Sequence, residues 1–159
     1  MFVFDQQKIT DLCQVAASRE RKRMNQNIHP ELSDPVQRLF NAMQPLSYVQ
    51  PHRHLGMDTW EGFVLVQGSG IALTFDEHGV VTHRAELSEH TVRMVEIPSE
   101  TFHTVLAIAP DTVFFEIKRG PYHPDKAKSF APWAPAEGEE RALKYAQWLQ
   151  RAQIGESFL

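Results

Sequence analysis

Between Tyr48 and Lys118, short apolar runs alternate with turns, and this pattern constrains the fold more than any other feature of the chain. Runs that alternate between apolar and polar residues predict half-buried strands. Strands are expected at 48–54, 61–67, 70–76, 80–87, 92–97, 102–109 and 112–118. Short strands spaced about ten residues apart are typical of an antiparallel sandwich or barrel, so the predicted fold class is mainly β.

Helical patterns precede this β region. A first helix is expected over 5–18, where Ile9, Leu12, Cys13 and Ala16 recur at spacings of three and four residues.

A second helix is expected over 34–45. Asp34 suits the N-cap, Pro35 suits the first helical position and Pro45 ends the pattern. One apolar face would contain Val36, Leu39, Phe40 and Met43.

After the strands, a Pro-rich arm over 120–135 is expected to lie against the β region, and a last helix is expected over 137–153. We therefore predict one domain over 1–159. It would comprise a helical flank (1–45), a β-barrel (46–119) and a C-terminal part (120–159).

Composition excludes several classes of protein. A hydrophobic content of 42% and a charged content of 23% are those of a globular chain. The net charge of −4 gives no reason to expect nucleic acid, and no apolar run approaches the length of a membrane span. The single cysteine, Cys13, excludes an intrachain disulfide, and a cytoplasmic location is the default expectation.

Four residues indicate a metal site: His52, His54, Glu61 and His103. The two histidines of the His-x-His pair point to the same face of a strand, because side chains alternate. Glu61 opens the next strand, and His103 stands at the start of a later one. Three imidazoles and one carboxylate suit one divalent transition metal ion per chain, but they leave open whether it is Zn, Fe, Ni or Mn.

The wider pattern resembles the cupin superfamily. The stretch Pro51-His52-Arg53-His54, with Glu61 and Gly68, matches its first signature, and Pro98 with His103 matches the centre of its second. The superfamily usually has Gly near Leu46 and at Glu100. The resemblance implies a jelly-roll β-barrel.

One branch, the WbuC-type cupin-fold metalloproteins, resembles the chain over about residues 20 to 138. The matching stretches are 22–30, 34–38, 51–54, 120–122 and 130–138. This resemblance implies a small bacterial metalloprotein often linked to O-antigen or surface-polysaccharide genes.

Further candidates lie near the predicted metal. Glu116 is either an outward-facing carboxylate or a general base close to the ion, and Tyr48 shares its predicted face with His52 and His54. Both are candidate catalytic residues.

The flanking segments offer the groups expected to bind substrate. These are Arg23, Asn25, Asn27, His29, Lys118, Tyr122 and Trp133. Arg and Lys recognise carboxylate or phosphate, and Asn and Tyr suit sugar hydroxyls. Trp133 either covers the mouth of the pocket or, together with Tyr122, fastens the arm to the barrel.

The favoured function is a metal-dependent cupin acting on a small sugar-derived or anionic metabolite, by isomerisation, elimination or oxygenation. A binding module that senses a metal or metabolite without turnover, and a metal-free sugar epimerase or isomerase, remain alternatives. A homodimer is expected because unpaired edge strands need cover.

Overall fold

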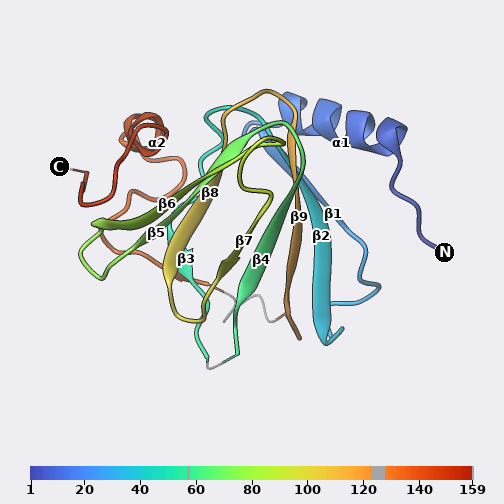
Figure 1. Ribbon diagram of the computed structural model, residues 1–159, viewed down its shortest axis with the longest axis horizontal. Helices are drawn as coiled ribbons and strands as arrows, with labels where there is room; N and C mark the ends of the chain where they lie inside the picture. Colours follow the sequence, from blue (N-terminus) through green and yellow to red (C-terminus); the bar gives the residue numbers. More distant parts are fainter. Residues whose placement is uncertain (57, 123–127, 159) are drawn as a thin grey trace.

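The computed structural model describes residues 1–56, 58–122 and 128–158, and within them the strands form two five-stranded antiparallel sheets (Figure 1). Sheet I has the order β1 (Arg23–Asn27), β2 (Val36–Met43), β9 (Thr112–Arg119), β4 (Glu61–Gln67) and β7 (Met94–Ile97). Sheet II has the order β10 (Ser129–Phe130), β3 (His52–Arg53), β8 (Phe102–Ala107), β5 (Gly70–Phe75) and β6 (Val81–Leu87). The predicted mainly-β class is confirmed.

Apolar side chains from both sheets share one buried cluster. Phe63 and Phe114 of sheet I belong to it together with Ala72 and Val105 of sheet II. This arrangement is a sandwich with its core between the layers. The pairing of the described strands does not join the two sheets, so a closed barrel is not confirmed.

The helix α1 (Gln6–Ser18) packs across one end of sheet I, against β1, β2 and β9 (Figure 1). Asp5 begins it, because its carboxylate accepts a hydrogen bond from the backbone N–H of Lys8 at 3.1 Å. Its predicted apolar stripe is buried against the sheet residues Ala42 and Val113. The first helix is therefore confirmed. In the described part of the chain, neither helix is long and apolar enough to cross a membrane.

The second predicted helix is wrong, since 36–43 form strand β2. The Asp34 carboxylate does accept a hydrogen bond from the backbone N–H of Val36, but the chain then extends. β2 pairs with β1 on one side and with β9 along its whole length on the other. This pairing outweighs a helical pattern that is also compatible with a strand buried on both faces.

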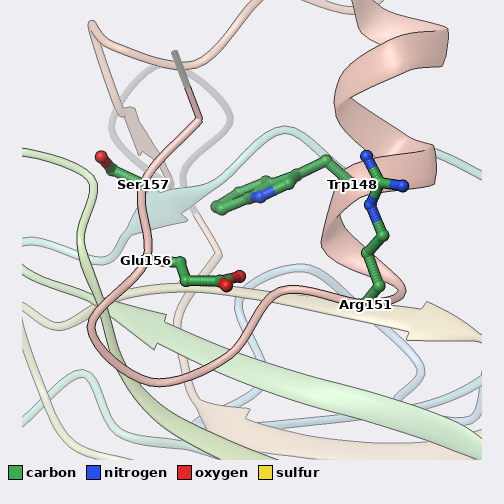
Figure 2. Close-up of a pocket in the computed structure, with 4 residues that line it drawn as sticks. All are labelled: Trp148, Arg151, Glu156 and Ser157. Atoms are coloured by element: carbon green, nitrogen blue, oxygen red, sulfur yellow. The ribbon is translucent and has the colours of Figure 1, made fainter.

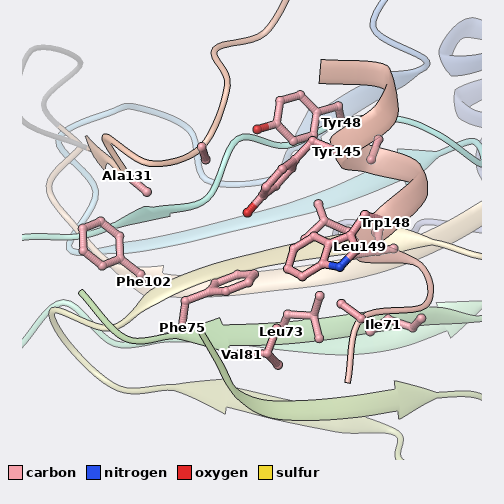
Figure 3. Packing of buried hydrophobic residues seen from close by; sticks show 14 of the residues in the cluster. Tyr48, Ile71, Leu73, Phe75, Val81, Phe102, Ala131, Tyr145, Trp148 and Leu149 are labelled. Atoms are coloured by element: carbon pink, nitrogen blue, oxygen red, sulfur yellow. The ribbon is translucent and has the colours of Figure 1, made fainter. Parts of the chain in front are cut away.

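Aromatic residues cover the outer face of sheet II (Figure 3). The helix α2 (Ala142–Leu149) contributes Tyr145 and Trp148, which pack over Leu73 and Phe75 of β5. α2 is shorter than predicted because the residues before it form turns.

The described parts of the Pro-rich arm, 120–122 and 128–135, lie against the sheets, as expected. The N–H of Ala131 donates to the carbonyl of Pro51, and the N–H of Tyr122 donates to that of Leu32.

Leu46 and Glu100 both have positive φ angles, of 65° and 59°. These are the places where the cupin signatures usually have Gly. Both residues thus adopt the left-handed conformation that glycine adopts most easily, although they carry side chains.

Candidate metal centre and its cavity

The four predicted donors meet between the two sheets. His52 of β3 lies directly opposite His103 of β8 in sheet II, and His54 follows β3 by one residue. Glu61 begins β4 and reaches them from sheet I. One donor atom of each residue lies within 4.8 Å of the others, and all four side chains are buried.

Hydrogen bonds orient two of the imidazoles. His52 Nδ1 donates to the carbonyl of Gln50 at 2.9 Å, and His103 Nδ1 donates to that of Thr101 at 2.8 Å. In the neutral rings these bonds keep the proton on Nδ1, so each Nε2 presents a lone pair that can bind a metal ion.

The Glu61 Oε2 atom lies 2.9 Å from His103 Nε2 and 3.4 Å from His54 Nε2. A carboxylate oxygen and imidazole lone pairs repel each other unless a positive ion stands among them. The donor set therefore fits a divalent transition metal.

Electrostatics also favour metal ligation. Burial by itself would raise the pKa of Glu61, but the nearby charge of Lys118 holds it well below its usual value. Burial, aided by the charge of Lys128, lowers the pKa of His52 well below 6.5. At neutral pH the carboxylate is charged and the His52 imidazole is neutral, which are the forms that bind metal.

A chain of polar contacts runs from Glu61 along β9. Lys118 Nζ donates to Glu61 Oε1 at 3.0 Å and to Glu116 Oε1 at 2.6 Å. Asn41 of β2 donates to the other oxygen of Glu116 at 2.5 Å. Burial and the nearby charge of Glu61 raise the pKa of Glu116, whereas Lys118 opposes this shift. Burial alone would lower the pKa of Lys118, but the two carboxylates raise it overall.

These groups lie on the wall of a cavity of about 970 Å³. His52, Glu61 and His103 line it. The cavity also collects most of the predicted substrate-binding residues, namely Arg23, Asn25, Asn27, His29, Lys118 and Tyr122. The structure thus brings the predicted flank residues and the metal donors to one space.

Two predicted site residues lie elsewhere. Trp133 does not line the cavity but packs on Phe75 and Phe102, so it fastens the arm instead of covering the pocket. Tyr48 belongs to the aromatic cluster outside sheet II, and its hydroxyl donates to the carbonyl of Pro135 at 2.6 Å. The predicted strand 48–54 is real only at 52–53, so alternation does not place Tyr48 beside the histidines.

Arg23 lines the cavity, but other groups already occupy its guanidinium. It donates to the carbonyl of Tyr48 at 2.8 Å and pairs with Glu137 of the arm. Arg21 pairs with the same carboxylate at 2.8 Å. Arg23 therefore holds the turn at Glu137 near β1.

The sequence pattern does not predict several cavity residues, and Asn41 and Lys128 are two of them. The helical pattern expected over 34–45 does not predict that Asn41 faces a cavity. In a strand, alternation places Asn41 on the same face as Leu39, and both line the cavity. Lys128, just before β10, has no motif around it in the sequence. Lys128 is exposed as a whole residue, yet desolvation at its ammonium group lowers its pKa, while the charge of Glu61 opposes the shift.

A second hollow of about 490 Å³ lies beside α2 (Figure 2). Its lining residues are Trp148, Arg151, Glu156 and Ser157. The Glu156 carboxylate accepts a hydrogen bond from the backbone N–H of Gln153, so it stabilises the local turn. The larger cavity, with its donors, is the better candidate site.

Solved structures identify the class of fold. A cupin superfamily protein from Desulfitobacterium hafniense is similar, with a TM-score of 0.51, 14% identity, and coverage of 68% of this chain and 86% of that one. The capsular polysaccharide assembling protein CapF from Staphylococcus aureus has a TM-score of 0.51 and 18% identity over 61% of this chain. The chain spans only 26% of CapF. KdgF from Halomonas sp. has a TM-score of 0.50 and 16% identity, with coverage of 65% and 82%.

These likenesses establish a cupin fold and nothing finer. The model of one sequence family, a domain of unknown function called DUF6016, matches residues 4–87, which is more than half of the chain. The protein belongs to the DUF6016 family. No curated protein matches the sequence.

Proposed function

We propose that this protein is a metal-dependent cupin of the WbuC type that acts on a small sugar-derived or anionic metabolite of surface-polysaccharide biosynthesis. The observation that carries the proposal is the buried cluster of His52, His54, Glu61 and His103 beside a cavity of about 970 Å³. The likeness to CapF, whose name refers to capsular polysaccharide, agrees with the sugar context but comes from only part of that protein.

The chemistry needs a group that moves a proton beside the metal donors. A metal bound there would supply a Lewis acid or activate a water molecule. Glu116 suits the proton transfer, because burial raises its pKa and its carboxylate lines the cavity. Lys118 holds this carboxylate and that of Glu61 in fixed positions. This pairing favours an enzyme over a sensor, since binding alone does not require a carboxylate placed to act as a general base.

The first test is elemental analysis of protein purified without a His tag or added metal. About one divalent ion per chain is expected, and almost none in the His52→Ala/His54→Ala variant. Full metal content in that variant would refute the assigned ligands.

The second test asks whether the site turns over substrate. Metal-loaded protein is incubated with a panel of sugar metabolites, and products are followed by NMR. Glu116→Gln should lower turnover by roughly 10²- to 10⁴-fold with metal content unchanged. Glu139→Gln, an exposed residue of the same type, is the matched control. Metal-loaded protein that binds a metabolite without converting it would support the sensor function instead.

A further inference from the structure

The charges inside the cavity define the kind of ligand that the metal centre needs. In the described lining, the carboxylates of Glu61 and Glu116 and the ammonium groups of Lys118 and Lys128 lie within electrostatic reach of one another. These four charges cancel. With neutral imidazoles, a divalent ion at the cluster therefore leaves two positive charges without compensation. The other charged lining residues, Arg19, Glu20, Arg21, Arg23 and Glu137, add one further positive charge.

The two carboxylates are already occupied. Lys118 contacts one oxygen of each, His103 approaches the other oxygen of Glu61, and Asn41 donates to the other oxygen of Glu116. Lys128 makes no hydrogen bond or ion pair with the residues for which the structure gives positions. Its ammonium group lies within electrostatic reach of His52 and Glu61, so it is an unpaired cation beside the metal centre.

We infer that the ligand of this cavity is a small hydroxylated acid with two negative charges, one acidic group meeting the metal centre and the other meeting Lys128. The inference rests on the proposed metal site and names the substrate class for it. Two uncompensated positive charges in a partly desolvated space cost free energy, and a ligand with two negative charges neutralises them. The amide groups of Asn25 and Asn27 on the same wall suit the hydroxyls of such a ligand.

The test compares three open-chain molecules with the same carbon skeleton: sorbitol, gluconate and glucarate, which carry no, one and two negative charges. Zinc-loaded protein is titrated with each in a calorimeter. Affinity should rise roughly tenfold or more with each charge, as for a charge-assisted hydrogen bond. Glucose 6-phosphate carries both negative charges on one group. Comparing its affinity with that of glucarate distinguishes a phosphate ligand from a dicarboxylate. Metal content is measured again after each titration because glucarate chelates metal.

Lys128→Gln should weaken glucarate binding about tenfold, to the level of gluconate, and leave metal content and melting temperature unchanged. Lys128→Arg should retain most of the affinity. Lys144→Gln, the same change at an exposed position on α2, should have no effect.

Equal binding of sorbitol and glucarate, or unchanged glucarate binding in Lys128→Gln, would overturn the inference while leaving the metal site intact. A protein that holds no metal would instead refute the proposed function and, with it, the charge argument.

Discussion

At the end of the sandwich that holds the metal donors, the two faces of sheet II carry opposite kinds of residue. On β8, Phe102 and Leu106 point outward into the aromatic cluster with Tyr145 (Figure 3), whereas His103 points inward to the metal donors. The outer face buries apolar groups, which stabilises the fold. The inner face at this end of the sandwich buries charged and polar groups, which costs free energy unless an ion or ligand compensates. Residues that stabilise the fold and residues that would bind a metal or ligand thus lie on opposite faces of the same sheet.

The largest expected effect is on metal binding by the inner face. His52→Ala/His54→Ala removes two of four donors, so affinity should fall by at least about 10³-fold, because each structural ligand contributes several kcal/mol to binding. Elemental analysis and competition with a chelator measure this loss. The metal-free variant should melt no lower than the metal-free parent; a large drop would mean that these histidines also hold the fold.

A substitution on the outer face should lower the folding stability and leave metal binding unchanged. Leu73 is fully buried, and Leu73→Ala should lower the free energy of unfolding by about 3 kcal/mol through lost packing. Denaturant unfolding of the metal-free protein gives this value. Metal stoichiometry of the folded variant should stay at the parental level, and a parallel loss of metal would show that the two faces are not independent.

As the pH falls, protonation of His52 and then of Glu61 on the inner face should lower the stability of the protein. Folding lowers the pKa of His52 below 6.5 and that of Glu61 below 4.5. At pH values between the lowered pKa and the ordinary pKa of each group, the unfolded chain therefore binds more protons than the folded one. Stability of the metal-free protein should therefore fall as pH drops below 6.5, and again below 4.5. Melting temperature against pH tests this order. In His52→Ala, the first part of the decline should shrink.

The smallest effect concerns the turn at Glu100. Its φ of 59° costs a residue with a side chain about 1 kcal/mol, which glycine avoids. The Glu100 carboxylate makes only a long contact of 3.4 Å with the N–H of Gly56. Glu100→Gly should therefore raise the free energy of unfolding by about 0.5 kcal/mol, less than the full strain because glycine is freer when unfolded. Destabilisation would mean that this contact matters more than the strain.

The sequence predicted the strands from 61 to 118 well, because turn residues separate them and alternation is regular. It also predicted that His52, His54, Glu61 and His103 would converge, and the structure gathers one donor atom of each within 4.8 Å of the others. Both successes depend on local signals. The histidine pair needs only one strand, Glu61 is the first residue of β4, and His103 is the second residue of β8.

The errors arose where distant pairing decides the structure. Whether 36–43 is a helix or a strand depends on β9, which lies far along the sequence. Tyr48 and Trp133 were misplaced because neither strand alternation nor composition shows that α2 and the arm cover sheet II. The homodimer remains a prediction.

Glu61 comes from sheet I and the three histidines come from sheet II or the residue beside it. An ion held by all four would therefore act as a reversible cross-link between the two layers, in a chain whose single cysteine cannot provide a covalent one. Binding at 100 times the dissociation constant would add about 2.7 kcal/mol to stability. Metal supply would then set how long each copy of the protein survives in a cell.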